Sequence, residues 1–100
     1  MAMTPEAKVK KVIKDWLKTL PYCWWFMPIG GAYTSHGVPD IVGLINGRFF
    51  AIEVKAAGKI KNTTRLQDIT IAAIKAAGGV TIVADDLSIV QAAFARHGLI

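Results

Sequence analysis

The sequence contains almost none of the residues that cross-link small domains. Its 100 residues include one cysteine, Cys23, so no internal disulfide can form. That cysteine and the two histidines do not have the spacing of a zinc site. Cys23 is instead expected to be a small buried hydrophobic side chain. Stability should therefore come from the packing of one core.

Long apolar segments are also absent. The hydrophobic runs are short and interrupted, so none is expected to span a bilayer. The first residues lack the basic segment, apolar stretch and cleavage site of an export signal. We therefore expect no membrane association and a cytoplasmic location, which would be the host-cell cytoplasm for a phage-encoded protein. The composition, 53% hydrophobic and 19% charged, is typical of a globular protein, and residues 1–100 are expected to form a single domain.

Acidic residues are scarce. Seven Asp and Glu stand against twelve Lys and Arg, which gives a formal net charge of +5. This excess favours a polyanionic partner but does not distinguish nucleic acid from acidic lipid or acidic protein. The basic residues gather in the first predicted helix and after the predicted hairpin; those expected to contact phosphate are Lys8, Lys11, Lys59, Lys61 and Arg65. An ordinary solvated face explains the helix lysines equally well.

Periodicity and end signals predict the order α-β-β-β-α-β-α. Thr4-Pro5-Glu6 is typical of a helix start, and Pro21 ends that helix. Strands are predicted for residues 22–27, 40–45, 48–55 and 80–84. A right-handed crossover makes the last of these parallel to the third. The expected fold is α/β, with a mixed central sheet flanked by helices.

Two further helices complete this prediction. The second begins after Thr63 or Thr64 and ends before Gly78-Gly79. Its expected buried stripe consists of Leu66, Ile69, Ala73, Ile74 and Ala77. The last helix spans residues 87–97 and is capped by Asp85 or Asp86.

A hairpin is the most informative local feature. Asn46-Gly47 lies between two apolar runs and predicts a two-residue turn. In that register Asp40 faces Glu53, with Cβ atoms about 5 Å apart, and Lys55 shares their sheet face. Two opposed carboxylates repel unless a divalent cation bridges them, and Mg²⁺ binds one or two carboxylates together with water and phosphate oxygens. The hairpin therefore predicts a metal site directed at phosphate.

The residues of this hairpin resemble a known nuclease pattern. Pro39-Asp40, followed after twelve residues by Glu53-Val54-Lys55, is similar to the PD-(D/E)XK nuclease superfamily. More narrowly, the chain resembles the small stand-alone phage and bacterial members of the VRR-NUC family. The segments that carry this likeness are Gly37 to Gly43, Asn46 to Phe49 and Ala51 to Lys55, with Gln67 downstream. The resemblance covers most of the chain and implies a restriction-endonuclease-like fold.

The resemblance also implies an activity, namely cleavage of DNA phosphodiester bonds that depends on Mg²⁺ or Mn²⁺. Asp40, Glu53 and the Val54 carbonyl would bind the metal. Lys55 would orient or help to deprotonate the attacking water and stabilise the transition state. Gln67 would line the site. Glu6 corresponds to the acidic residue that many related nucleases place on their first helix near the metal, which implies that Glu6 is a further metal ligand.

Several of these residues have simpler explanations. Gln67 also fits a capping box with Thr64, and Glu6 also fits a favourable contact with the helix dipole. Asp40 could be only a turn residue and Glu53 with Lys55 an exposed edge pair, although the apolar neighbours of Glu53 argue against an idle surface strand. His36 could touch phosphate or be an incidental loop residue.

The substrate is inferred less directly. No module that reads base sequence is apparent, and stand-alone members of the family resemble Holliday-junction resolvases. Branched DNA cut by a homodimer is therefore the expected partner, with Tyr22 to Met27 and the tail Gly98-Leu99-Ile100 as dimer surfaces. Unlike many family members, Pro28 to Val38 contains no lysine or arginine. The alternatives are a nicking or restriction-type subunit that needs a targeting partner, a noncatalytic DNA-binding protein, and an interaction module with a vestigial site.

Overall fold

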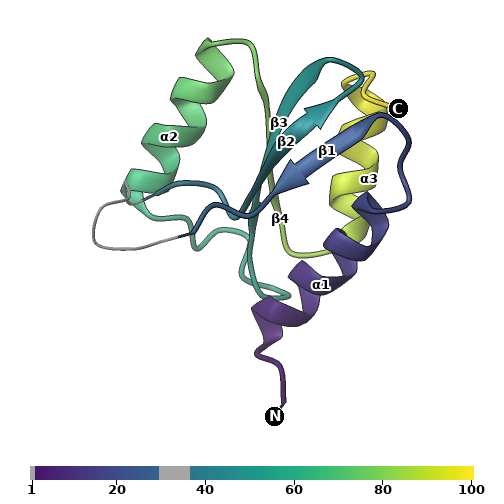
Figure 1. The fold of residues 1–100 in the computed structure, drawn as a ribbon. Coiled ribbons are helices and arrows are strands. Elements are labelled where there is room, and N and C mark those ends of the chain that lie inside the picture. Colours follow the sequence, from purple (N-terminus) through teal and green to yellow (C-terminus); the bar gives the residue numbers. More distant parts are fainter. Residues whose placement is uncertain (1, 30–36) are drawn as a thin grey trace.

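The computed structural model describes residues 2–29 and 37–100 (Figure 1). Its elements are α1 (Pro5–Leu17), β1 (Cys23–Phe26), β2 (Ile41–Ile45), β3 (Arg48–Val54), α2 (Arg65–Ala76), β4 (Val80–Ala84) and α3 (Leu87–Arg96). The predicted order is therefore confirmed. His36 lies outside the described residues. Within the described part of the chain, no helix is both long and apolar enough to cross a bilayer.

The four strands form one mixed sheet in the order β1-β2-β3-β4. The first two pairs are antiparallel, and β3 and β4 are parallel, as the crossover prediction requires. Ile45 pairs with Arg48, so the turn between β2 and β3 has two residues. Asn46 and Gly47 both have positive φ, 50° and 78°, which is the conformation that this turn demands. The predicted hairpin register is confirmed.

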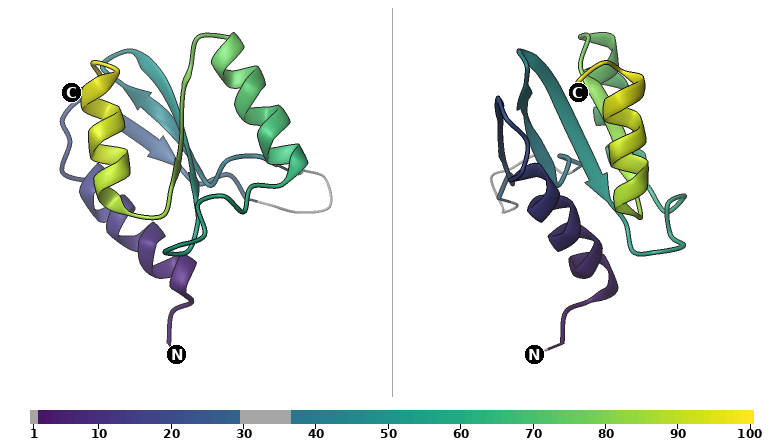
Figure 2. Two further views of the ribbon diagram at one scale, coloured as in Figure 1. Left: turned by 180° about the vertical axis from the view of Figure 1, so that it is seen from behind. Right: turned by 90° about the vertical axis from the view of Figure 1, so that its right-hand side faces the viewer.

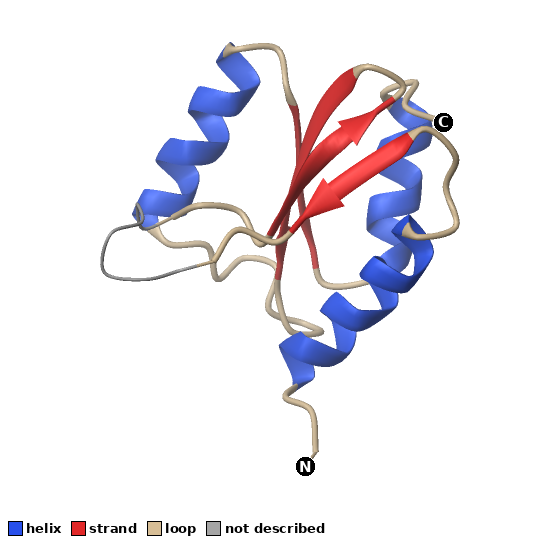
Figure 3. Ribbon diagram, in the orientation of Figure 1, coloured by secondary structure: helices blue, strands red, loops and turns tan. Residues whose placement is uncertain are grey.

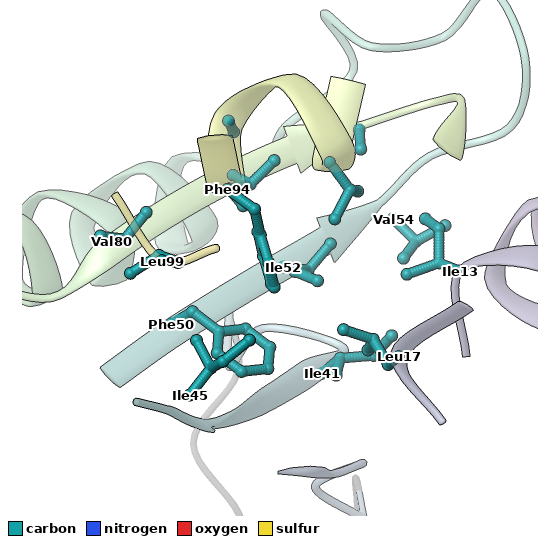
Figure 4. Packing of buried hydrophobic residues seen from close by; sticks show 14 residues of the cluster. Ile13, Leu17, Ile41, Ile45, Phe50, Ile52, Val54, Val80, Phe94 and Leu99 are labelled. Atoms are coloured by element: carbon teal, nitrogen blue, oxygen red, sulfur yellow. The ribbon is translucent and has the colours of Figure 1, made fainter. Parts of the chain in front are cut away.

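The sheet is sandwiched between helices, with α1 and α3 on one face and α2 on the other (Figures 2 and 3). The main core lies between the sheet and the α1–α3 pair. There Phe50 of β3 meets Phe94 of α3 edge-on, with ring centroids 5.1 Å apart. Ile13 and Leu17 of α1 are fully buried in the same cluster (Figure 4). This packing holds the N-terminal helix firmly against the sheet.

The opposite face is only partly covered. None of the twelve residues of α2, all of which the structure describes, is buried, so the expected buried stripe is wrong. Leu66 and Ile69 are about half exposed. The reason is that α2 packs beside β4, an edge strand, rather than across the middle of the sheet. The β1–β2 half of this face therefore presents exposed apolar side chains: Trp24, Phe26 and Leu44.

The C-terminal tail also differs from expectation. Leu99 is fully buried, and its N–H donates to the Phe94 carbonyl at 2.8 Å. Its own carbonyl accepts from the side chain of Asn46 at 2.8 Å. Leu99 is thus a core residue that ties α3 to the hairpin turn, so its predicted place in a dimer surface is wrong. Ile100 is exposed, and its part in a dimer stays a prediction.

Candidate functional site

The candidate site lies where β2 begins and β3 ends, at the end of the sheet nearest the start of α1 (Figure 1). Asp40 directly precedes β2, and the pairing of Ile41 with Ile52 points it toward Glu53. The Asp40 side chain also contacts the backbone of β3, where its Oδ2 accepts a hydrogen bond from the Val54 N–H at 2.8 Å. The hairpin register thus brings Asp40 to the end of β3.

The backbone of β3 adds a further oxygen. In an extended strand the N–H and C=O of one residue point to the same side. Since the Val54 N–H bonds to Asp40, its carbonyl lies on the Asp40 side as well. The next N–H, from Lys55, points the other way and donates to Ala84 of β4 at 2.9 Å. The Val54 carbonyl is therefore on the correct edge to join the two carboxylates.

Glu53 is the more deeply buried of the two carboxyl groups, Asp40 and Glu53. It is 5% exposed, and its Oε1 accepts from Gln67 Nε2 at 3.0 Å. Its Oε2 is buried and has no hydrogen-bond partner among the described residues. Burial is the main cause that raises the pKa of Glu53 to about 8, and the neighbouring Asp40 adds to the shift, while Lys55 opposes it. This carboxyl group lacks a positive partner sufficient to keep it ionised.

Lys55 and Gln67 form a connected pair beside Glu53. Lys55, which is 8% exposed, donates from Nζ to Gln67 Oε1 at 2.9 Å and lies 3.8 Å from Glu53 Oε1. Gln67 Oε1 also accepts from the Thr64 N–H at 2.9 Å, and Thr64 Oγ1 accepts from the Gln67 N–H at 3.1 Å. Gln67 therefore completes the capping box of α2 and also bridges Lys55 to Glu53, while its role in a reaction stays a prediction.

Lys10 was not among the predicted site residues, yet it contacts the site directly. Its Nζ donates to Asp40 Oδ1 at 3.3 Å and lies 3.8 Å from Glu6. A signal was present in the sequence, because Lys10 stands at i−3 from Ile13 and i−7 from Leu17, on the buried face of α1. A partly buried lysine is stabilised by a carboxylate, and the one nearest in space is Asp40, thirty residues further along the chain.

The other predicted residues are less closely grouped. Glu6 is half exposed and reaches the site through Lys10. Lys11 is exposed and paired with Asp15 at 2.7 Å, and Lys8 lies on another side of α1. Three exposed basic residues surround the approach to α2, namely Lys59, Lys61 and Arg65. Their roles remain predictions.

Gly37 fixes how the Asp40 segment meets α2. Its φ is +84°, which favours glycine. A Cβ added there would lie 2.6 Å from the Leu66 carbonyl carbon and oxygen and 2.9 Å from the Gln67 nitrogen. These are backbone atoms that cannot turn aside. The glycine of the sequence motif thus lets the chain pass directly against the first turn of α2.

The chemistry of these groups fits a divalent cation. Within residues 2–29 and 37–100, no three Asp, Glu, His or Cys side chains gather closely enough to hold an ion. Mg²⁺ does not need three, because it is often bound through one or two carboxylates and keeps several waters. Glu53 Oε2 is buried and accepts no hydrogen bond from the described residues, so it could serve as an oxygen ligand, and Asp40 lies beside it as a second carboxylate. The residues that could hold Mg²⁺ or Mn²⁺ are therefore Asp40, Glu53 and the Val54 carbonyl.

No protein-family model matches the chain, and no curated protein matches it. The case for a function therefore rests on the residues of the site and their geometry.

Proposed function

We propose that this protein is a Mg²⁺- or Mn²⁺-dependent DNA endonuclease of the PD-(D/E)XK type, with a restriction-endonuclease-like fold and four-way junctions as its substrate. One observation carries the proposal. Two carboxylates, one directly before β2 and one in β3, lie beside a buried lysine, and one of them has a buried oxygen that accepts no hydrogen bond from the part of the chain that the structure describes. A structural ion pair would not leave that oxygen unsatisfied. A site that binds a cation and a phosphate accounts for it.

Each residue then has a defined task. When bound, the cation would supply Lewis acidity, which lowers the pKa of water and offsets charge on phosphoryl oxygens. Asp40, Glu53 and the Val54 carbonyl would hold it. Lys55 presents its ammonium group to the scissile phosphate and stabilises the added negative charge of the transition state. Gln67 is a positioning residue, because it fixes Lys55 and Glu53 relative to each other.

The first prediction concerns Gln67. Gln67→Glu keeps an acceptor oxygen for the capping box, but it replaces the amide that donates to Glu53 with a second carboxylate. We expect cleavage to fall by about a hundredfold or more, while the capping box keeps its acceptor and any loss of stability comes from the repulsion between the new carboxylate and Glu53. Cleavage rates and thermal unfolding of the same preparation measure both effects.

Gln67→Ala is the matched control, since it removes both functions. It should lose about 1 kcal/mol of stability as well as activity. Wild-type cleavage rates for Gln67→Glu would contradict the positioning role.

Basic residues of α1 offer a path for the DNA backbone. Lys11, Lys14 and Lys18 follow at spacings of three and four residues and therefore share one helix face. With Lys10 and Asp15 they line a surface groove of about 280 Å³ that begins next to the candidate site. Lys8 instead lines a different hollow, with Asp86 and Leu87. We propose that the strip formed by Lys10, Lys11, Lys14 and Lys18 contacts phosphates near the cleaved bond.

The second prediction tests this lysine strip through the salt dependence of binding. Lys14→Gln and Lys18→Gln should each lower the magnitude of the slope of log K against log salt by about 0.9, because each would remove one phosphate contact. Binding is measured in EDTA to prevent cleavage. Lys8→Gln is the control, and its slope should equal that of the wild type. If all three variants had the wild-type slope, the strip would be excluded from the DNA interface.

An apolar patch supports the dimer. Trp24, Phe26 and Leu44 are 65%, 47% and 49% exposed, and the first two rings lie 5.5 Å apart. Neighbouring exposed aromatic side chains of this kind are typical of an interaction surface. A second copy related by a twofold axis would cover this patch with its own. Such a homodimer would provide the two active sites that symmetric junction cleavage requires.

The third prediction is the substrate test. The protein is incubated with labelled four-way junction, fork, single strand and linear duplex, each with Mg²⁺, Mn²⁺ or EDTA. We expect paired, symmetric incisions in the junction with either metal and none in EDTA. Preference for linear duplex would favour a nicking or restriction-type subunit. Salt-dependent binding without any product would favour a noncatalytic DNA-binding protein.

A further inference from the structure

The contacts of Lys10 are unusual for a lysine on a basic helix. Its side chain is only 20% exposed, and its ammonium group lies 3.3 Å from Asp40 Oδ1. The other oxygen of Asp40 is already bonded to the Val54 N–H. Lys10 therefore lies against the oxygen that Asp40 would offer to the proposed metal.

An ammonium group and a divalent cation repel each other strongly at such short range, so both cannot share Asp40 Oδ1. Lysine, however, has a long flexible stem and can swing away from a partner. A second carboxylate is within reach, because Glu6 lies one helical turn earlier at 3.8 Å from the Lys10 ammonium. Glu6 is 46% exposed, so an ammonium group that moved toward it would also gain hydration.

We propose that Lys10 is an internal counter-ion of the metal site: it neutralises Asp40 until a divalent cation displaces it, and Glu6 then receives its ammonium group. This inference rests on the proposed metal site. It gives Glu6 a role other than that of a metal ligand. It also makes metal affinity depend on a residue that need not touch the metal. Displacement would free Lys10 at the start of the lysine strip, next to the approaching phosphate.

The test measures metal affinity rather than activity. Mn²⁺ binding is followed by isothermal titration calorimetry at fixed pH, without DNA. Lys10→Met removes the competing charge and keeps the length of the side chain, so it should bind Mn²⁺ about tenfold more tightly or better. Lys8→Met, on the same helix but away from the site, should bind like the wild type. Lys10→Gln repeats the measurement with a polar side chain, and circular dichroism verifies that each variant is folded.

A double-mutant cycle separates the two possible roles of Glu6. Glu6→Gln should weaken Mn²⁺ binding several-fold in the wild-type background, because Lys10 loses its alternative partner. In the Lys10→Met background it should have no effect. Weakened binding in both backgrounds would make Glu6 a ligand and overturn its proposed role.

Failure of this inference differs from failure of the proposed function. If Asp40→Asn abolishes Mn²⁺ binding while Lys10→Met and Lys10→Gln leave it unchanged, the metal site stands and the counter-ion role is refuted. If Asp40→Asn binds Mn²⁺ like the wild type, the metal site itself is refuted, and the counter-ion role with it.

Discussion

Replacing Glu53 by glutamine is expected to lower DNA cleavage by about a thousandfold or more while leaving the fold intact. Glutamine has the same shape, but it carries no charge and is a weak ligand for Mg²⁺. Its amide nitrogen takes the place of the buried Oε2 and can donate to the neighbouring Asp40 carboxylate, so the variant should be no less stable than the wild type. Asp40→Asn and Lys55→Met should lose activity to a similar extent.

The decisive comparison is between cleavage and binding. Single-turnover rates on a labelled four-way junction give the first, and junction affinity in EDTA gives the second. Affinity should change by no more than a few-fold, because the phosphate contacts lie mostly elsewhere. Asp68→Asn is a matched control, since Asp68 is an exposed acid in the first turn of α2, one residue from Gln67. Undiminished cleavage by the triple variant of Asp40, Glu53 and Lys55 would refute the assignment of the site.

The second large effect is a dependence of stability on pH. The pKa of Glu53 is raised from 4.5 to about 8 by burial and by Asp40. Between these values the folded state holds a proton that the unfolded chain has lost. The unfolding free energy of the metal-free protein should therefore fall as pH rises from about 4.5 to 8, by up to about 1.4 kcal/mol per pH unit. Small domains are only marginally stable, so a loss of this sign is large enough to be measured.

Urea unfolding in EDTA at a series of pH values measures this slope. Glu53→Gln should remove it, because glutamine does not titrate. Mg²⁺ should restore stability at the alkaline end, since it binds the ionised carboxylate of the folded state and thereby favours folding. A wild-type slope equal to that of Glu53→Gln would show that Glu53 keeps an ordinary pKa.

Much of the fold was predictable because short-range signals agreed with long-range ones. The Asn46-Gly47 turn sets the register that brings Asp40 to the end of β3. The crossover rule sets β4 parallel to β3. Thr64 and Gln67 form the capping box that predicts the start of α2, and the same glutamine donates a hydrogen bond to Glu53. In these places one residue serves both local structure and the candidate site.

Other features depend on how the elements pack, which no local pattern encodes. The side chains of α2 are apolar enough to be buried, but the helix packs beside an edge strand and leaves Leu66 and Ile69 half exposed. Leu99 looks like a free apolar tail and instead closes the core. The partner of Lys10 depends on the tilt of α1 across the end of the sheet, so the pairing with Asp40 could be seen only in three dimensions.

Gly37 is a local sequence feature that also determines how two elements pack. It carries no functional group, yet it is in close contact with the backbone of Leu66 and Gln67. The segment that supplies Asp40 and the helix that supplies Gln67 are therefore in direct backbone contact at Gly37, and this contact sets their spacing. Any side chain at this position would push the two segments apart and would separate the residues of the candidate site without altering one of them. In a directed-evolution experiment, variation at Gly37 would change the spacing of the residues in the candidate site, whereas variation at Asp40, Glu53 or Lys55 would change the chemistry of the site.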